Sequence, residues 1–262
     1  MGTSTHNIGQ KGTTPLVPSW LEDDDDKKKI MPNIGASDRF AAARGDLTRY
    51  ISSGGRDTYN ARSGLSKYVK NSLGGSSNAA RRMGSANRSA ARLLGGYGAF
   101  VAGGVHEFER YFSLQDVSNR PISEVLTLLT DKICEDGGLI DQSIFRSAYI
   151  DALTDSPEIA GKTIAEMTPE MFLSIIKDAI ANTVTGRITN DVFNKVISFP
   201  NDVDEASQLE EQVEDFIQNG VSDAFAKENI NVNHLTESDA NSVVTHVYER
   251  TFRFIELAGE DV

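Results

Sequence analysis

Apolar side chains recur every three or four positions through the second half of the chain, which is the spacing of amphipathic helices. The four stripes are Ile122, Val125, Leu126, Leu129 and Ile133; Phe172, Ile175, Ile176 and Ile180; Leu209, Val213, Phe216 and Ile217; and Val243, Val244, Val247, Tyr248 and Phe254. Thr168 and Thr236 are suited to cap helix starts, the second with Asp239 in the first turn. Gly220 is predicted to end the third helix. Because no alternating strand pattern is present, we predict an all-α fold with an acidic helical-bundle domain over residues 106–262.

Glycine pairs divide the preceding region, residues 35–105, into short segments. Glycine just past a helix suits the left-handed conformation there, so each pair predicts a helix end. The predicted helices span 37–52, 56–73 and 76–94, and they precede Gly54-Gly55, Gly74-Gly75 and Gly95-Gly96. We expect the glycines of 95–104 to form a loop between the two regions. The similar tripeptides Arg49-Tyr50-Ile51 and Lys67-Tyr68-Val69 indicate at most a degenerate helix–turn repeat.

Charge is divided unevenly along the 262 residues, although the net charge is −12. Residues 35–105 contain eleven Lys and Arg against three acids, a net +8. Residues 106–262 contain eleven Lys and Arg against thirty acids, a net −19. This asymmetry predicts two regions that meet different partners, or one region that folds against the other.

Arginines in the basic region are spaced to share one helix face. Arg81, Arg88 and Arg92 lie at positions i, i+7 and i+11, with Arg82 beside them. The tyrosines upstream are Tyr50, Tyr59 and Tyr68. Arginines with interleaved aromatics can contact phosphates and stack on bases. The alternative is acidic protein surface, which we favour over nucleic acid because the adjacent region carries −19.

Residues that carry metal or catalytic chemistry are sparse. The four histidines have no metal-ligand spacing with one another or with Cys134, and no phosphate-binding glycine motif is present. Cys134 cannot form an internal disulfide and is expected to be a small core residue, in keeping with a reducing cytoplasm. No run of 18 apolar residues predicts a membrane span. We therefore expect no cofactor, no metal and no enzymatic activity of the chain's own.

Residues 1–34 read as an extended arm rather than as a helix or strand. This arm contains Pro15, Leu16, Val17, Pro18, Trp20 and Leu21. A plain disordered tail is poor in aromatic and branched residues, so we expect this element to dock on a partner. Asp23 to Lys27 resembles an engineered protease site, but the residues before it do not resemble a tag, and we treat it as native.

Gly2 follows the initiator methionine and is small enough for Met1 to be removed. The exposed α-amine would have a pKa of about 8, against about 10.4 for lysine, so a sizeable fraction is nucleophilic at neutral pH. N-myristoylation is an alternative use of Gly2, but its pattern requires Ser or Thr where this chain has His6. We infer that the start of the chain is presented to a partner.

Three parts of the sequence together resemble the QatB family of the bacterial Qat anti-phage defence system. They are Gly2-Thr3-Ser4-Thr5, the element from Thr14 to Leu21, and the run from Ser37-Asp38-Arg39-Phe40 through Asn78-Ala79-Ala80-Arg81-Arg82-Met83. The resemblance is most specific over about the first 95 residues.

The resemblance implies three partners: the ATPase QatA, the QueC-like protein QatC and the TatD-like nuclease QatD. QueC-type enzymes activate a carboxylate on a 7-deazaguanine with ATP and transfer it to an amine, which implies Gly2 as the acceptor. Thr3, Ser4 and Thr5 would then line the entry channel, and Pro15, Leu16, Val17, Pro18, Trp20 and Leu21 would bind the partner. The alternatives are a nucleic-acid-binding adaptor for the system's ATPase and nuclease, and a helical scaffold whose arm is bound but never modified.

Overall fold

The computed structural model describes residues 38–134, 140–192, 203–228 and 235–260, and side-chain environments from residue 211 onward in the third range. These ranges contain nine α-helices and no β-strand, which confirms the predicted all-α class. The predicted arm, residues 1–34, lies outside them. The helices are α1 (Ala41–Ser52), α2 (Thr58–Lys67), α3 (Ser76–Arg81), α4 (Gly84–Phe112), α5 (Ile122–Ile133), α6 (Ile140–Thr154), α7 (Pro169–Asp191), α8 (Val203–Ala226) and α9 (Glu237–Leu257).

Two of the three predicted glycine stops are confirmed. Gly54 and Gly55 follow α1 with φ of 63° and 75°, and Gly74 and Gly75 have φ of 81° and 95°. The latter pair ends a π-helical turn, Tyr68–Leu73, that extends α2. Only glycine adopts this left-handed backbone without a steric cost, so the chain reverses at both pairs.

The third glycine stop, at Gly95-Gly96, is wrong, because both glycines lie inside α4. The helix departs from helical geometry later, at Gly103 and Gly104, where the chain turns back on itself. A Cβ on Gly95 would collide with the Tyr111 side chain, and one on Gly96 would collide with the ring of Phe112. These glycines therefore allow close packing between the parts of α4 that precede and follow the kink.

The single helix predicted over 76–94 is also wrong. The chain ends α3 at Arg81 and begins α4 at Gly84. At the junction Met83 is buried with 1% of its surface exposed, so the turn places an apolar side chain in the core. Arg81 therefore lies on a different helix from Arg88 and Arg92.

Helix starts in the acidic region follow their predicted caps. Thr168 accepts a hydrogen bond from the Met171 backbone N–H at the start of α7. Thr236 and Asp239 form a reciprocal capping box at the start of α9. Gly220 does not end α8 as predicted, since the helix continues to Ala226. A Cβ on Gly220 would lie 2.7 Å from Cδ1 of Phe254. Its missing side chain instead lets α9 approach α8.

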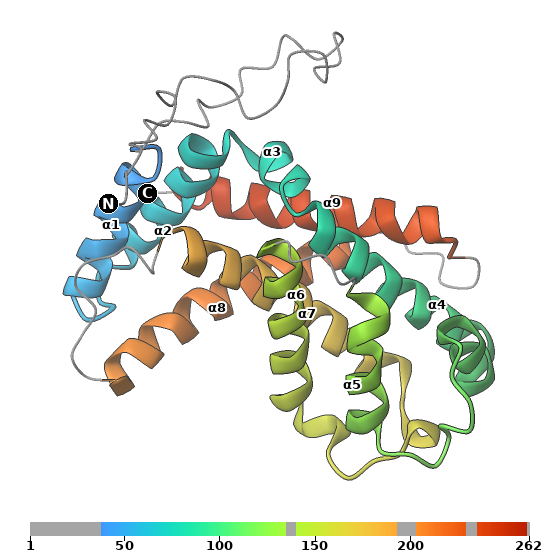
Figure 1. Ribbon diagram of the computed structural model, residues 1–262. Helices are drawn as coiled ribbons and strands as arrows, with labels where there is room; N and C mark the ends of the chain where they lie inside the picture. The colour runs from blue at the N-terminus through green and yellow to red at the C-terminus, as the bar shows by residue number, and fades with distance from the viewer. Residues whose placement is uncertain (1–37, 135–139, 193–202, 229–234, 261–262) are drawn as a thin grey trace, which may run out of the picture. The chain divides into compact units, whose positions relative to one another are not determined.

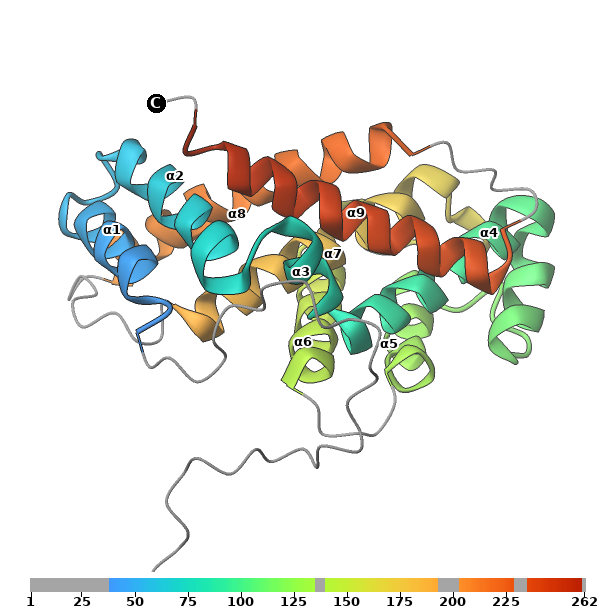
Figure 2. The ribbon, with the colours of Figure 1, turned by 90° about the horizontal axis from the view of Figure 1, so that it is seen from above.

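The last helix joins the basic and acidic regions. Helix α9 contacts α2, α3, α4 and α8, and Figures 1 and 2 both show it running alongside α3 and α4. Buried side chains from Phe40 to Ile255 belong to one hydrophobic core. All of the described residues belong to one compact unit, so packing does not separate the two oppositely charged regions.

Candidate functional site

The residues expected to bind and react with a partner enzyme lie outside the described residues. They are Gly2, Thr3, Ser4, Thr5, Pro15, Leu16, Val17, Pro18, Trp20 and Leu21. The structure therefore places none of them. What it does place is the helical body that follows, beginning with α1 and α2.

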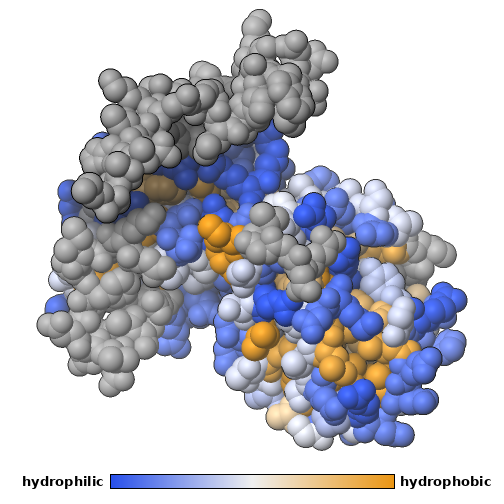
Figure 3. Space-filling view, viewed as in Figure 1, coloured by the Kyte–Doolittle hydropathy of each residue, from blue (hydrophilic) through white to orange (hydrophobic). Residues whose placement is uncertain are grey.

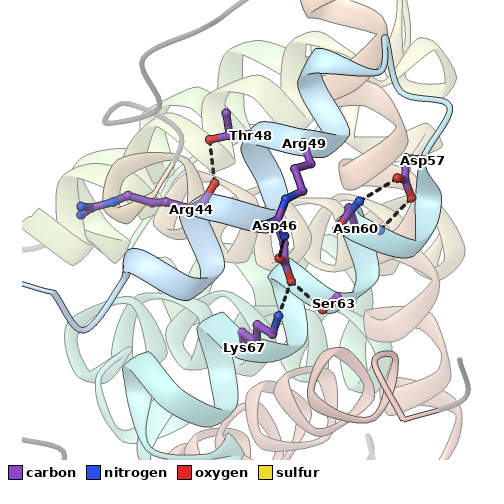
Figure 4. Close-up of polar contacts among 8 residues, drawn as sticks. All are labelled: Arg44, Asp46, Thr48, Arg49, Asp57, Asn60, Ser63 and Lys67. Atoms are coloured by element: carbon purple, nitrogen blue, oxygen red, sulfur yellow. Dashed lines mark hydrogen bonds and ion pairs between the residues drawn. The ribbon is translucent and has the colours of Figure 1, made fainter.

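Asp46 is the polar centre of the α1–α2 pair (Figure 4). Its side chain is 5% exposed and lies 2.6 Å from Lys67 Nζ and 2.8 Å from Arg49 Nη1. Ser63 Oγ donates a third hydrogen bond at 2.6 Å. Burial acts to raise the pKa of Asp46, but the hydrogen bonds from Lys67 and Ser63 and the two cationic charges outweigh it and lower that pKa. Asp46 therefore stays ionised and fastens α2 to α1.

The degenerate repeat seen in the sequence has a structural counterpart. Arg49 and Lys67, the first residues of the two tripeptides, both pair with Asp46. The second residues, Tyr50 and Tyr68, are 1% and 0% exposed. Both therefore serve the core and are not available to stack on bases.

Each of these tyrosines reaches a helix of the acidic region. Tyr50 Oη donates to Oε1 of Gln212 at 3.0 Å, and Tyr68 Oη donates to Oδ2 of Asp191 at 3.0 Å. Tyr59, the third tyrosine of the expected stacking set, is 54% exposed.

Hydrogen bonds also join the basic helices to α9 and its C-terminal end. Ser66 Oγ donates to the backbone oxygen of Glu256 at 2.6 Å. Asn87 Nδ2 lies 2.8 Å from Thr245 Oγ1 in α9. Lys70 Nζ and Glu260 Oε1 form an exposed ion pair at 3.1 Å. The basic region thus folds against the acidic region through hydrogen bonds and buried side chains as well as through an exposed ion pair.

The four arginines of the predicted basic face do not lie on a single helix. Arg81 is exposed at the end of α3 and donates to Asn78 Oδ1. Arg88 is exposed on α4, whereas Arg92 is partly buried there. Arg82 is partly buried in the α3–α4 junction, beside Arg39 and Arg187. The break at Met83 is the reason for this division.

An acidic groove runs between α6, α7 and α8, lined in part by Asp151, Asp155 and Glu214. Burial and the neighbouring carboxylates raise the pKa of Glu214. The amide nitrogen of Asn182 donates to Glu214 Oε1 at 2.9 Å and to the backbone oxygen of Asp178 at 3.1 Å. The groove presents negative potential, and no feature on the described residues points to a particular ligand.

Exposed apolar side chains lie on α5 and α6. Leu128, Ile140 and Ile150 are 45%, 63% and 42% exposed. Figure 3 shows apolar patches on the side of the molecule that holds these helices. Scattered exposed apolar residues are normal, but a gathering of them marks a surface suited to protein contacts.

Cys134 and His246 both lie within the described part of the chain. Cys134 is 1% exposed, and burial raises the pKa of its thiol, so the prediction of a core cysteine is confirmed. His246 lies on α9 with Nδ1 3.6 Å from Glu228 Oε2. Among the described residues no group of three His, Cys, Asp or Glu side chains is placed to hold a metal ion. None of the described helices has the length and apolar character needed to cross a membrane.

The described helices define an all-α protein with charged and apolar side chains exposed on its surface. A model of the family described as "Qat anti-phage system associated protein QatB" matches residues 74–255. This span is more than half of the chain, so the protein belongs to the QatB family and is a component of an anti-phage defence system.

The match complements the sequence resemblance. The resemblance is most specific in about the first 95 residues, and the match lies mainly in the acidic region. Both include the run Asn78 to Met83. No curated protein sequence and no solved structure is similar enough to the chain to match.

Proposed function

We propose that this protein is a non-enzymatic, cytoplasmic component of the Qat system whose N-terminal arm is bound and modified by the QueC-like partner. The observation that carries the proposal is the Gly2-Thr3-Ser4-Thr5 start, in a chain that belongs to the QatB family. An unblocked glycine amine is a compact nucleophile with a pKa of about 8. It therefore suits a narrow acceptor site better than a lysine does.

The proposed reaction is an acyl transfer to Gly2. After Met1 is removed, the Gly2 nitrogen attacks the carboxyl carbon of an adenylated 7-carboxy-7-deazaguanine. The new C–N amide bond forms, the C–O bond to AMP breaks, and the amine loses a proton. Because the partner supplies both the activated base and the ATP-dependent step, this chain contributes only the acceptor amine and its delivery.

Delivery of Gly2 is the proposed task of the arm. Thr3, Ser4 and Thr5 offer hydrogen-bonding groups of low bulk along the entry channel. Pro15, Leu16, Val17, Pro18, Trp20 and Leu21 anchor the arm on the partner's surface. Large aromatic side chains commonly dominate the energetics of protein interfaces, which makes Trp20 the principal anchor.

The helical body supports this proposal by holding the basic helices in place. Tyr50 and Tyr68 are buried against the acidic region, which leaves the expected base-stacking set incomplete. This observation favours protein contacts over the nucleic-acid adaptor as the main role of residues 35–105. The body would also contact the system's ATPase and nuclease.

Phage protection by Gly2→Glu tests the proposal in cells that carry the complete Qat system. The bulky residue should retain Met1 and deny the amine to the partner, so protection should be lost. Gly12→Glu is the matched control, because it places the same side chain within the arm but away from the terminus. Circular dichroism should show both variants as helical as the parent.

Full protection by Gly2→Glu would overturn the proposal. Loss of protection by both variants to the same degree would also contradict it, because the terminus would then have no special role. If the partner binds the arm but Gly2 is never modified, the result supports the alternative of a helical scaffold instead.

A further inference from the structure

Two arginines flank one buried aromatic ring at the start of the helical body. The guanidinium carbon of Arg39 lies 4.5 Å from the ring centroid of Phe40, and that of Arg44 lies 5.5 Å from it. Phe40 is 6% exposed and stacks on Tyr68 with a centroid distance of 6.0 Å. Both guanidinium groups therefore lie against the same buried ring.

Two further arginines approach the same aromatic pair from α7 and the α3–α4 junction. Arg187 Nε donates to Asp191 Oδ2 at 3.1 Å, and the same oxygen accepts from Tyr68 Oη. Partial burial, followed by the charges of Arg39 and Arg187, lowers the pKa of Arg82. Arg82 therefore lies within electrostatic reach of both.

Among the described residues, carboxylates pair with one of these four arginines. Arg187 is paired with Asp141 and Asp191. Among the described residues, no carboxylate lies at ion-pair distance from Arg39, Arg44 or Arg82. Arg39 Nη1 and Arg44 Nε are buried nitrogens with no hydrogen-bond partner there. A buried donor without a partner is costly, so Arg39 and Arg44 would be stabilised by an anion that accepts from these nitrogens.

We propose that Arg39, Arg44 and Arg82 form a binding site for a small phosphate-bearing anion, such as a pyrophosphate or nucleotide phosphate group. Guanidinium forks match phosphate oxygens with paired hydrogen bonds. A phosphoryl group carries about −1.5 to −2 charge and compensates more than one arginine, which a single carboxylate does not.

The placement of the donors favours a small ligand over a nucleic acid strand. All three arginines are partly buried. Arg39 and Arg44 lie against the ring of Phe40, and Arg82 lies within electrostatic reach of Arg39 and Tyr68. A polymer backbone is instead met by an exposed row of cations, as in grooves that follow single strands. The site does not depend on Gly2 or on the arm, so it stands or falls separately from the proposed function.

Titration of the full-length protein with inorganic pyrophosphate tests the site, with the thermal midpoint and calorimetric heat as readouts. Ionic strength is matched with potassium chloride at each point. Pyrophosphate should raise the midpoint saturably. Arg82→Gln should weaken pyrophosphate binding at least ten-fold while leaving the ligand-free midpoint unchanged or raised, because it removes an uncompensated charge. Arg88→Gln, an exposed arginine on α4, should leave both unchanged.

Other outcomes would overturn the proposal. A midpoint shift no larger than that of matched chloride, or equal losses in Arg82→Gln and Arg88→Gln, would show general screening. Single-stranded DNA at equal phosphate concentration is the competitor. If it displaces pyrophosphate, and if Arg82→Gln abolishes DNA binding, the cluster is a nucleic-acid site. If Arg82→Gln is unstable, Arg39→Gln replaces it, and unweakened binding in Arg39→Gln would contradict the site.

Discussion

Gly96 lies against the ring of Phe112, which belongs to the same helix beyond its kink. The close approach requires the missing side chain of Gly96, since a Cβ there would overlap the ring. The non-helical residues Gly103 and Gly104 return the chain so that the two positions meet. The ring centroid of Phe112 lies 5.2 Å from that of Phe108, and the centroid of Phe108 lies 5.8 Å from that of Phe172 in α7. This contact therefore ties α4 to the centre of the core.

Gly96→Ala should destabilise the protein by about 1–3 kcal/mol, the usual cost of overfilling a packed core. Gly45→Ala is the control, because Gly45 lies within α1 and a Cβ added there would meet no neighbouring atom within 4 Å. That change should stabilise the helix by about 0.5–1 kcal/mol. Urea unfolding measures both, and the packing account is wrong if the two variants shift the free energy of unfolding alike.

The sequence predicts those parts of the fold that depend on local structure, and it fails where a residue's role depends on tertiary contacts. Periodic apolar residues and capping threonines report local structure, so α5, α7 and α9 follow the prediction. Gly95, Gly96 and Gly220 do not end helices, because their role is set by the aromatic side chains of Tyr111, Phe112 and Phe254. Such contacts depend on tertiary packing, which the local pattern does not contain.

The candidate sites show the same limit. Arg81, Arg88 and Arg92 have the spacing of one helix face, but the break before Gly84 separates the first from the others. The sequence pattern does not single out Arg39 and Arg44, because their significance depends on Phe40 stacking on Tyr68 from a distant part of the chain. The sequence shows only that Arg39 and Arg44 lie near Phe40 in the chain, and it does not show that Arg82 approaches them.

Asp46→Asn should lower the free energy of unfolding at neutral pH by about 1.5–3 kcal/mol, the range for hydrogen bonds to a charged group. The native pKa of Asp46 is below its ordinary value of 3.8. A carboxyl group with a lowered native pKa stabilises the fold above its unfolded pKa, and this contribution is lost as pH falls through the native pKa. The difference between parent and variant should therefore be constant above about pH 5 and shrink below about pH 4.

Glu260→Gln is the control for Asp46, because Glu260 pairs with Lys70 on the exposed surface. Exposed ion pairs contribute about 0–1 kcal/mol, so this variant should unfold almost as the parent does. Denaturant titrations from acid to neutral pH make the comparison. A parent–variant difference for Asp46→Asn that persists unchanged into acid would contradict an ionised, ion-paired Asp46.

Trp20→Ala should weaken binding to the QueC-like partner by about 2–4 kcal/mol, as expected for an aromatic interface anchor. Its thermal midpoint should stay close to that of the parent. Phe172→Ala, which removes a buried core ring, should instead lower the midpoint strongly. Calorimetry and thermal denaturation separate the two effects, and a destabilised Trp20→Ala protein with intact binding would reassign Trp20 to the core.

Binding to nucleic acid should be weak at physiological salt, with a dissociation constant of about 10⁻⁵ M or weaker for duplex and single strands alike. The logarithm of the association constant should fall linearly with the logarithm of the salt concentration, with a slope of about −0.9 per neutralised phosphate on duplex DNA. Changing Arg81, Arg88 and Arg92 to glutamate should disturb folding or partner assembly first. Nanomolar binding to a DNA or tRNA in physiological salt would instead favour the adaptor.

The intact mass of this chain, purified after co-expression with the QueC-like partner, tests the central claim most directly. We expect Met1 to be absent and the mass to rise by one 7-deazaguanine acyl group, with fragmentation placing the added group on Gly2. An inactive partner, unable to use ATP, should leave the chain without Met1 and otherwise unmodified. An unmodified Gly2 in the chain isolated with the active partner would contradict the account.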